Sequence, residues 1–595
     1  MRKILYFMAM FLAATVLAGC ADLWKEKSNN QWGEEYVWTI SEMAMGVLNS
    51  AYSAMPGTPD HYGSNFLDAA TDNAVTNVYT SDVYKLTSGN WSATSNPLSN
   101  WTSCYTQFQH INTFLEKGLT DKIVYDKENA EQDAAYKKRL YGEAHFLRAY
   151  YGFQLLQQYG GKTDDGQALG YPIAIQFITE DDAADFKAIK RNTYEECVLQ
   201  ILKDCDTAIE NLPAAYTGAD IVLGSGSIGL PTSLAAAALK SRVSLYAASP
   251  AYQTDKVTTI TGMGEFNVVD EQAYAAGWER AAVIADEVIN MNGFGTAFYG
   301  IQATDLADAG NTTPAEFLLR KFSNARTMES RHFPPYYLGK ANTTPSQNLV
   351  DAFPMANGYP INDPASGYDP SNPYVGRDNR FYLNVYHHGA TYGNTGLPVN
   401  VMAGGKDSYT YNANASLSGY YLAKFLSKNE LMLDPMAATN SQHYYPLIRK
   451  AEVFLNFAEA ANEAWGPKGK GAGCTYSAYD VIKMIREASG GIQDTGYLDK
   501  VAEEGKDAFR TLIQNERRLE LAFENHRWYD LRRCLLPLDE PARGVKVSIE
   551  NGVLTYDTSV VVAERKFDDI RYYYSPMPYD ECIKNPGLIN NKGWK

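Results

Sequence analysis

The sequence predicts an all-α fold: a tetratricopeptide-like superhelix of helical hairpins with a long, irregular, loop-rich ligand-binding portion. Two observations predict the helices, because apolar residues recur at helical spacing in many segments and alanines gather on the expected contact faces. A third predicts the loops, since Gly, Pro, Asn, Ser and Tyr become dense between about residues 295 and 447. No fixed repeat period is visible in the sequence, so the hairpin architecture rests on the helix faces.

A capping box marks the clearest helix start. Thr193 is followed three residues later by Glu196, and such a pair satisfies free backbone N–H groups at a helix N-terminus. Pro213 stops this helix, because proline lacks the N–H that a helix interior needs. Its apolar stripe consists of Val198, Ile201, Leu202, Cys205, Ala208, Ile209 and Leu212.

Further helices are expected on both sides of the loop-rich portion. One stripe runs from Leu140 to Leu155 and ends at Gly160-Gly161. Small residues such as Ala235, Ala281 and Ala458 lie on contact faces, where they let helices approach closely. The other expected helices span residues 233–248, 274–291, 448–464, 477–488 and 508–524.

The first twenty residues indicate export and a lipid anchor. A positive start, a short apolar run and the tetrapeptide ending in Cys20 are typical of a lipoprotein signal. The alternative is a plain secretory signal cleaved after Ala14 or Ala18. The predicted organisation is a signal peptide (1–19), a lipidated Cys20 with a flexible tether (20–40), and a single domain (41–595). Its helical scaffold lies mainly in 100–292 and 446–535, and its loop-rich portion in about 295–447.

Charge and motifs exclude several function classes. The formal net charge of −16 repels nucleic acid, so no nucleic-acid partner is expected. Residues 224–229 match G-x-G-x-x-G, but no βαβ unit or suitably spaced acid follows, which favours an inter-helix loop. We expect no catalytic residue, no metal and no cofactor. The charged stretch 516–533 is interpreted as a structural ion network, with Arg517–Glu520 and Asp530–Arg533 as pairs one helical turn apart.

Six segments, in order across nearly the whole mature chain, resemble motifs of the SusD/RagB family of nutrient-binding surface lipoproteins. The third departs from the family pattern by Ser for Thr and Asn for Asp. The segments are Trp101-x-x-x-Tyr105 with Asn112; Glu143 to Tyr151 with Tyr159-Gly160-Gly161; Pro345 to Phe353 with Asn357-Gly358; Arg449 to Val453 with Ala458-Glu459-Ala460; Glu516 to Arg533; and Pro576-Met577-Pro578 with Glu581 and Asn585-Pro586.

The resemblance implies a function. It implies non-catalytic binding of an oligosaccharide or polysaccharide at the cell surface, and delivery to a SusC-like TonB-dependent outer-membrane barrel. It also implies an outer-membrane location, with the N-terminal lipid as the membrane contact. Three alternatives stay open: a peptide-binding member of the family, a surface glycoside hydrolase, and a structural lid for the transporter without affinity of its own.

The expected ligand site is an exposed aromatic platform. Sugar rings stack their C–H faces on flat aromatic side chains, and their hydroxyls need polar partners. The segment 72–92 offers both kinds of side chain, and the prolines before Tyr336 hold a second aromatic cluster extended. The predicted ligand-binding residues are Trp91, Asp72, Asn73, Tyr84, Tyr336 and Tyr337.

The lipid anchor gives the first testable prediction. We expect Cys20 to carry the lipid and residues 1–19 to be absent from the mature protein, because start charge, apolar run and tetrapeptide agree. Mass spectrometry of the membrane fraction checks this. An unmodified N-terminus at another residue, or a Cys20→Ala protein that remains membrane-bound, contradicts it.

Overall fold

The computed structural model describes residues 34–176, 189–216, 229–253, 271–295, 298, 300–310, 314–567 and 569–594. The predicted signal peptide, Cys20 and the glycine-rich residues 224–228 lie outside these ranges. Residues predicted to belong to the tether form a short helix, α2 (Glu34–Val37).

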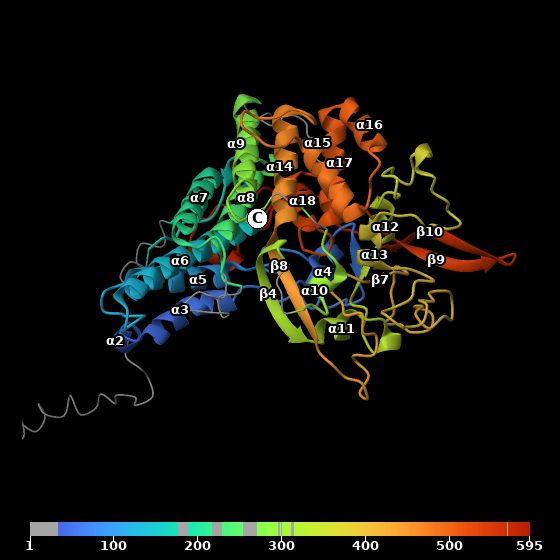
Figure 1. Ribbon diagram of the computed structural model, residues 1–595, viewed down its shortest axis with the longest axis horizontal. Coiled ribbons are helices and arrows are strands. Elements are labelled where there is room, and N and C mark those ends of the chain that lie inside the picture. The colour runs from blue at the N-terminus through green and yellow to red at the C-terminus, as the bar shows by residue number, and fades with distance from the viewer. Residues whose placement is uncertain are drawn as a thin grey trace, which may run out of the picture.

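Helices provide most of the regular structure (Figure 1). Among the described residues, no helix combines the length and apolar character needed to cross a bilayer. The helices are α3 (Ser41–Ser53), α4 (Asp82–Thr87), α5 (Trp101–Thr113), α6 (Ala130–Tyr159), α7 (Tyr194–Asn211), α8 (Ser233–Ala248), α9 (Glu271–Ile289), α10 (Ala303–Leu306), α11 (Thr327–His332), α12 (Gln347–Ala352), α13 (Asn379–Asn384), α14 (Lys450–Trp465), α15 (Ala478–Ile485), α16 (Gly496–Glu504), α17 (Lys506–Glu520), α18 (Arg527–Arg533) and α19 (Tyr579–Lys584).

Short strands accompany the helices. Within the described ranges they form five two-stranded antiparallel sheets, which pair β1 with β5, β2 with β3, β4 with β8, β6 with β7, and β9 with β10. The helix-rich part of the predicted fold class is confirmed, and these sheets add to it. The strands are β1 (Ala74–Thr76), β2 (Gly161–Lys162), β3 (Ala168–Leu169), β4 (Phe317–Ala325), β5 (Thr343–Pro345), β6 (Val385–Tyr386), β7 (Tyr421–Leu422), β8 (Ser441–Arg449), β9 (Ala542–Glu550) and β10 (Val553–Ala563).

Successive helices pack on one another, as Figure 1 shows for α6, α7, α8 and α9. The capping box at Thr193 is confirmed, and α8 has its predicted bounds. Helix α14 begins two residues later than predicted, because Ile448 and Arg449 end strand β8. The buried alanines of α8 allow close contact with its neighbours. The tetratricopeptide-like superhelix stays a prediction.

One hydrophobic cluster extends from Ala44 in α3 to Trp594 near the chain end. It contains side chains from the helices on both sides of the loop-rich portion and from that portion itself. The loop-rich portion therefore packs on the same core as the helices.

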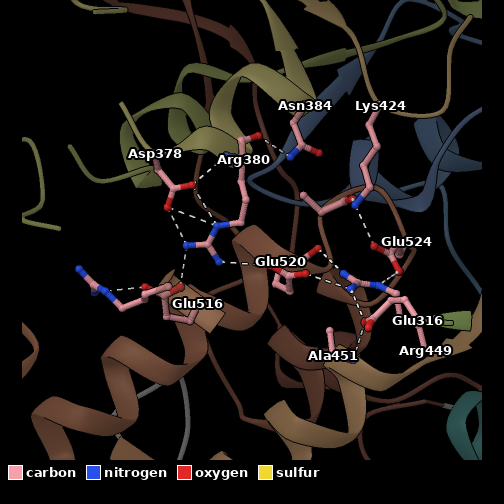
Figure 2. A network of polar contacts seen from close by, with 12 residues as sticks. Glu316, Asp378, Arg380, Asn384, Lys424, Arg449, Ala451, Glu516, Glu520 and Glu524 are labelled. Atoms are coloured by element: carbon pink, nitrogen blue, oxygen red, sulfur yellow. Dashed lines mark hydrogen bonds and ion pairs between the residues drawn. The ribbon is translucent and has the colours of Figure 1, made fainter. Parts of the chain in front are cut away.

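A buried ion network joins this portion to helix α17 (Figure 2). Arg449, at the end of β8, lies 3.2 Å from Glu316, 2.9 Å from Glu520 and 2.8 Å from Glu524. Lys424 also binds Glu524, at 2.8 Å. The structural interpretation of this part of the charged stretch is confirmed, because its carboxylates pair with buried cations.

A second set of pairs extends the network. Arg380 of α13 binds Asp378 and Glu516, each at 2.7 Å. Arg486, which follows α15, binds Glu516 from the other side at 3.2 Å. We define the ion network as Glu316, Asp378, Arg380, Lys424, Arg449, Arg486, Glu516, Glu520 and Glu524.

One of the two predicted helical pairs is correct. Asp530 binds Arg533 at 2.8 Å, as predicted. The predicted partner of Arg517 is wrong, because Arg517 binds Asp530 at 2.9 Å while Glu520 binds Arg449. Spacing along one helix indicates which side chains are neighbours, but partners from distant segments compete for them.

Burial and pairing move two carboxylate pKa values in opposite directions. Burial raises the pKa of Glu316 to about 7, although Arg449 opposes this. Burial acts in the same direction on Glu524, but Arg449 and Lys424 prevail and lower its pKa to about 2. Glu316 therefore carries a proton part of the time near neutral pH, whereas Glu524 stays charged.

Removal of Arg449 tests the network. We expect Arg449→Met to lower the free energy of unfolding by about 3–5 kcal/mol, because three buried carboxylates lose a shared cation. Urea unfolding measures the change. The control is Lys468→Met, whose partner Asp499 and own side chain are both exposed, and which should cost less than about 1 kcal/mol. Equal losses in the two variants would contradict the prediction.

The pKa of Glu316 predicts a pH dependence. The folded protein keeps the Glu316 proton up to about pH 7, whereas the ordinary pKa is 4.5. Between these values the folded state binds more protons, so the Glu316 contribution to stability falls as pH rises. We therefore subtract the unfolding free energy of the Glu316→Gln variant from that of the wild type at each pH. This difference should fall by on the order of 3 kcal/mol across the window. The control is Glu564→Gln, which removes an exposed carboxylate. A flat difference curve for Glu316→Gln would refute the prediction.

Candidate ligand-binding site

A short sheet brings the two predicted site segments together. Strand β1 pairs with β5, so that Thr76 lies opposite Thr343. Just beyond β1, the Asn77 amide donates to the carbonyl oxygens of Lys340, at 2.9 Å, and Asn414, at 3.1 Å. Three segments far apart in the sequence therefore meet at one end of this sheet.

Each of the three segments carries tyrosines near this junction. The Tyr79 ring lies 5.1 Å from the Tyr84 ring, at an interplanar angle of 84°. Partial burial is the main cause that raises the pKa of Tyr79 above its ordinary value, and the hydroxyls of Tyr409 and Tyr84 add smaller effects in the same direction. Tyr79, Tyr336 and Tyr409 are 55%, 47% and 48% exposed. We define the tyrosine surface as Tyr79, Tyr84, Tyr336, Tyr409 and the exposed Tyr411.

Lys406 links Tyr336 to the loop at residues 405–414, which is the segment that contains Asn414. Its Nζ lies 4.5 Å from the Tyr336 ring centre and 2.6 Å from the buried carboxylate of Asp407. The backbone N–H of Asn400 donates to the same carboxylate at 2.8 Å, and the Tyr421 hydroxyl donates to the Asp407 carbonyl at 2.7 Å. These bonds hold the loop that carries Tyr409 in one position.

The predicted exposed position of Trp91 is wrong. Its side chain is only 3% exposed, and its ring lies 5.4–6.0 Å from the rings of Trp528, Tyr572 and Trp594. A ring surrounded in this way presents no face to a ligand at the surface. Trp91 packs the chain end onto helix α18 instead.

The predicted polar partners Asp72 and Asn73 are also buried. Asp72 accepts two hydrogen bonds from Arg527, at 2.9 and 2.8 Å, and lies 3.0 Å from Arg518. Asn73 accepts a hydrogen bond from Arg518 at 2.7 Å. Burial opposes ionisation of Asp72, but Arg518 and Arg527 prevail and hold its pKa well below its ordinary value. These two residues therefore fasten the segment before β1 to the helices.

The remaining three predicted residues lie at or next to the tyrosine surface. Tyr84 is half-buried and Tyr336 is exposed, whereas Tyr337 is buried and stacks on Tyr392 at 5.0 Å. The Tyr337 hydroxyl accepts a hydrogen bond from the backbone of Leu397. Tyr337 thus anchors the short turn that presents Tyr336.

The prediction missed the contribution of the loop around residue 409. Its sequence, GKDSYTY at 405–411, places two tyrosines beside a lysine within the loop-rich portion. The density of tyrosine is a usable signal, because exposed tyrosines suit wet recognition surfaces. What the sequence lacks is any indication that this loop meets the segments near residues 79 and 336.

Comparisons with known families decide the identity of the fold. A family model described as "SusD family" matches residues 308–594, and one described as "Starch-binding associating with outer membrane" matches residues 25–245. The chain belongs to the SusD family. This confirms the resemblance found in the sequence motifs.

Curated relatives match over a limited stretch. A SusD-like protein of Formosa agariphila is 32% identical over 160 residues, which are 26% of this chain and 26% of that protein. A second SusD-like protein of the same organism is 30% identical over 171 residues, or 29% of this chain and 27% of that protein. The match therefore spans about a quarter of each curated relative.

Solved SusD-like structures match over nearly the whole chain. A SusD-like protein from Bacteroides fragilis has a TM-score of 0.70 at 24% identity, covering 94% of this chain and 99% of that one. A SusD-like carbohydrate binding protein from the same species has a TM-score of 0.67 at 19% identity, covering 93% and 99%. These likenesses establish the SusD-like fold.

Proposed function

We propose that this SusD-family protein is a non-catalytic binding protein for an oligosaccharide or polysaccharide, which it holds on the tyrosine surface. The observation that carries the proposal is the gathering of exposed tyrosines from three distant segments at one sheet end. The description of the matching family as starch-binding supports the ligand class, as does the carbohydrate-binding neighbour from B. fragilis.

The chemistry of the surface suits a sugar chain. Tyrosine rings offer apolar faces for the C–H groups of pyranose rings, while their hydroxyls both donate and accept hydrogen bonds. Lys406 adds a donor beside Tyr336. Because supporting residues such as Tyr337 and Asp407 are buried, the exposed rings are held in place before the ligand arrives, which lowers the entropy cost of binding.

The proposal includes a place of action. The family description associates these proteins with the outer membrane, and the lipid on Cys20 would provide the attachment there. We propose that the protein delivers its ligand to a SusC-like TonB-dependent barrel, as the family resemblance implies. Recovery of such a barrel with the full-length protein from native membranes supports this step, and repeated recovery without one counts against it.

The ligand class is tested with the soluble domain beginning near residue 30. Affinity electrophoresis against a panel of polysaccharides, and calorimetry against peptides, separate glycan from peptide binding. An assay for released reducing sugar tests for a glycoside hydrolase. Retarded migration in at least one glycan without sugar release is the expected result. Peptide binding alone would contradict the proposal, and flat results throughout would favour the structural lid.

Substitutions on the tyrosine surface make the site testable. We expect Tyr336→Ala and Tyr409→Ala each to weaken glycan binding by about 1–3 kcal/mol, by analogy with stacking of nucleobases on aromatic side chains. Calorimetric titration with the glycan found in the panel measures the loss. The control is Tyr141→Ala, which removes an exposed tyrosine from helix α6. Unchanged dissociation constants in both surface variants, with unaltered folding, would place the site elsewhere.

A further inference from the structure

A cavity of about 470 Å³ lies on another part of the molecule. It is bounded by helices α16 and α17 and by the chain between residues 352 and 362. None of its lining residues belongs to the tyrosine surface. Figure 1 shows α16 and α17 at the top of the molecule, whereas α4 and α11, next to the tyrosine surface, lie below. The volume is within the usual range for small-molecule sites.

The cavity reaches part of the buried ion network. Arg486 and Glu516 both line it, although they are only 2% and 1% exposed. They bind each other at 3.2 Å, and Arg486 also donates to the Gly358 carbonyl at 2.5 Å. A ligand in the cavity therefore meets polar groups that other bonds already hold in place.

The walls combine one aromatic ring with smaller polar and apolar groups. The Tyr497 ring forms one wall, with Pro354 and Pro360 as further apolar surface. Asn515 and Thr511 of α17 add an amide and a hydroxyl. This is the combination that a sugar ring needs, because its C–H face packs on an aromatic ring while its edge carries hydroxyls.

The charges around the cavity favour an uncharged ligand. On the floor, Arg486 is paired with Glu516, which Arg380 also binds. A negatively charged sugar would meet Glu516 and Glu504, which both line the cavity. A positively charged ligand would meet Arg486, which lines the cavity. Arg486 and Glu516 already neutralise each other, so Glu504 is the one described lining residue whose charge is left to act on a ligand.

We propose that this cavity is a second binding site, which takes one or two rings of a neutral saccharide. The inference extends the proposed function from one exposed surface to that surface plus a separate, partly open cavity. It rests on carbohydrate being the ligand class. The subsite is independent of the tyrosine surface in its residues, so the two can be disabled separately.

The test uses the soluble domain with D-glucose, D-galactose, maltose and cellobiose as probes in saturation-transfer NMR. Thr511→Trp places a large ring at the cavity, and we expect it to weaken binding of the responding probe about tenfold or more. Tyr497→Leu removes the aromatic wall and serves if Thr511→Trp fails to fold. The matched control is Glu503→Trp, since Glu503 is exposed on α16 but does not line the cavity.

A double variant separates this inference from the proposed function. Tyr336→Ala combined with Tyr409→Ala should lose polysaccharide retardation and keep probe binding within about twofold of the parent. Probe binding that survives both cavity variants, or that is lost only in the double variant, overturns the cavity assignment and leaves the proposed function standing. Absence of probe binding to the parent also overturns the assignment. If polysaccharides fail to bind as well, the proposed function falls with it.

Discussion

The structure depends on the pairing of charges that are almost completely removed from water. A buried carboxylate or guanidinium loses several kcal/mol of hydration, and only close opposite charges and hydrogen bonds offset that loss. In the ion network, Arg449 ends strand β8, Lys424 follows β7, Arg380 lies in α13, and Glu516 and Glu520 belong to α17. None of these segments can shift without leaving an unpaired charge inside the protein. The network therefore fixes the loop-rich portion relative to the helices, while its net stabilising energy can be small.

This constraint extends to the candidate surface through short links. Lys424, which binds Glu524, lies three residues beyond Tyr421, whose hydroxyl holds the Asp407 carbonyl. The Asp407 carboxylate in turn forms an ion pair with Lys406, whose ammonium group lies over the Tyr336 ring. A second link runs from Arg518 and Arg527 through Asp72 to strand β1. Segments without regular secondary structure can thus hold tyrosines in fixed positions, because the residues that support these segments are linked to buried ion pairs.

Local signals in the sequence predicted local structure well. The Thr193 capping box, the bounds of α8 and the Asp530–Arg533 pair all arise from residues within a few positions of one another. The failures have the opposite origin. Trp91 lies in a polar, loop-like stretch, but its burial comes from Trp528, Tyr572 and Trp594, all more than four hundred positions away. In the same way, Arg518 and Arg527 turn Asp72 from a plausible ligand contact into a structural residue. The meeting of three segments at Asn77 likewise depends on residues far apart in the sequence, because Asn77 binds Lys340 and Asn414.

Neighbouring tyrosines show how one sequence feature divides into two roles. Tyr336 and Tyr337 are adjacent and identical in chemistry, and the sequence predicts both as ligand-binding residues. The short 3-10 turn η6 (Pro335–Tyr337) directs them differently, so that Tyr337 stacks on Tyr392 while Tyr336 stays in solvent beneath Lys406. Burying one ring fixes the backbone that carries the other, and a ring on a fixed backbone loses little freedom when a sugar stacks on it. The buried residue is therefore a condition for the exposed one to act, which is why a recognition surface in an irregular segment needs more aromatic residues than it exposes.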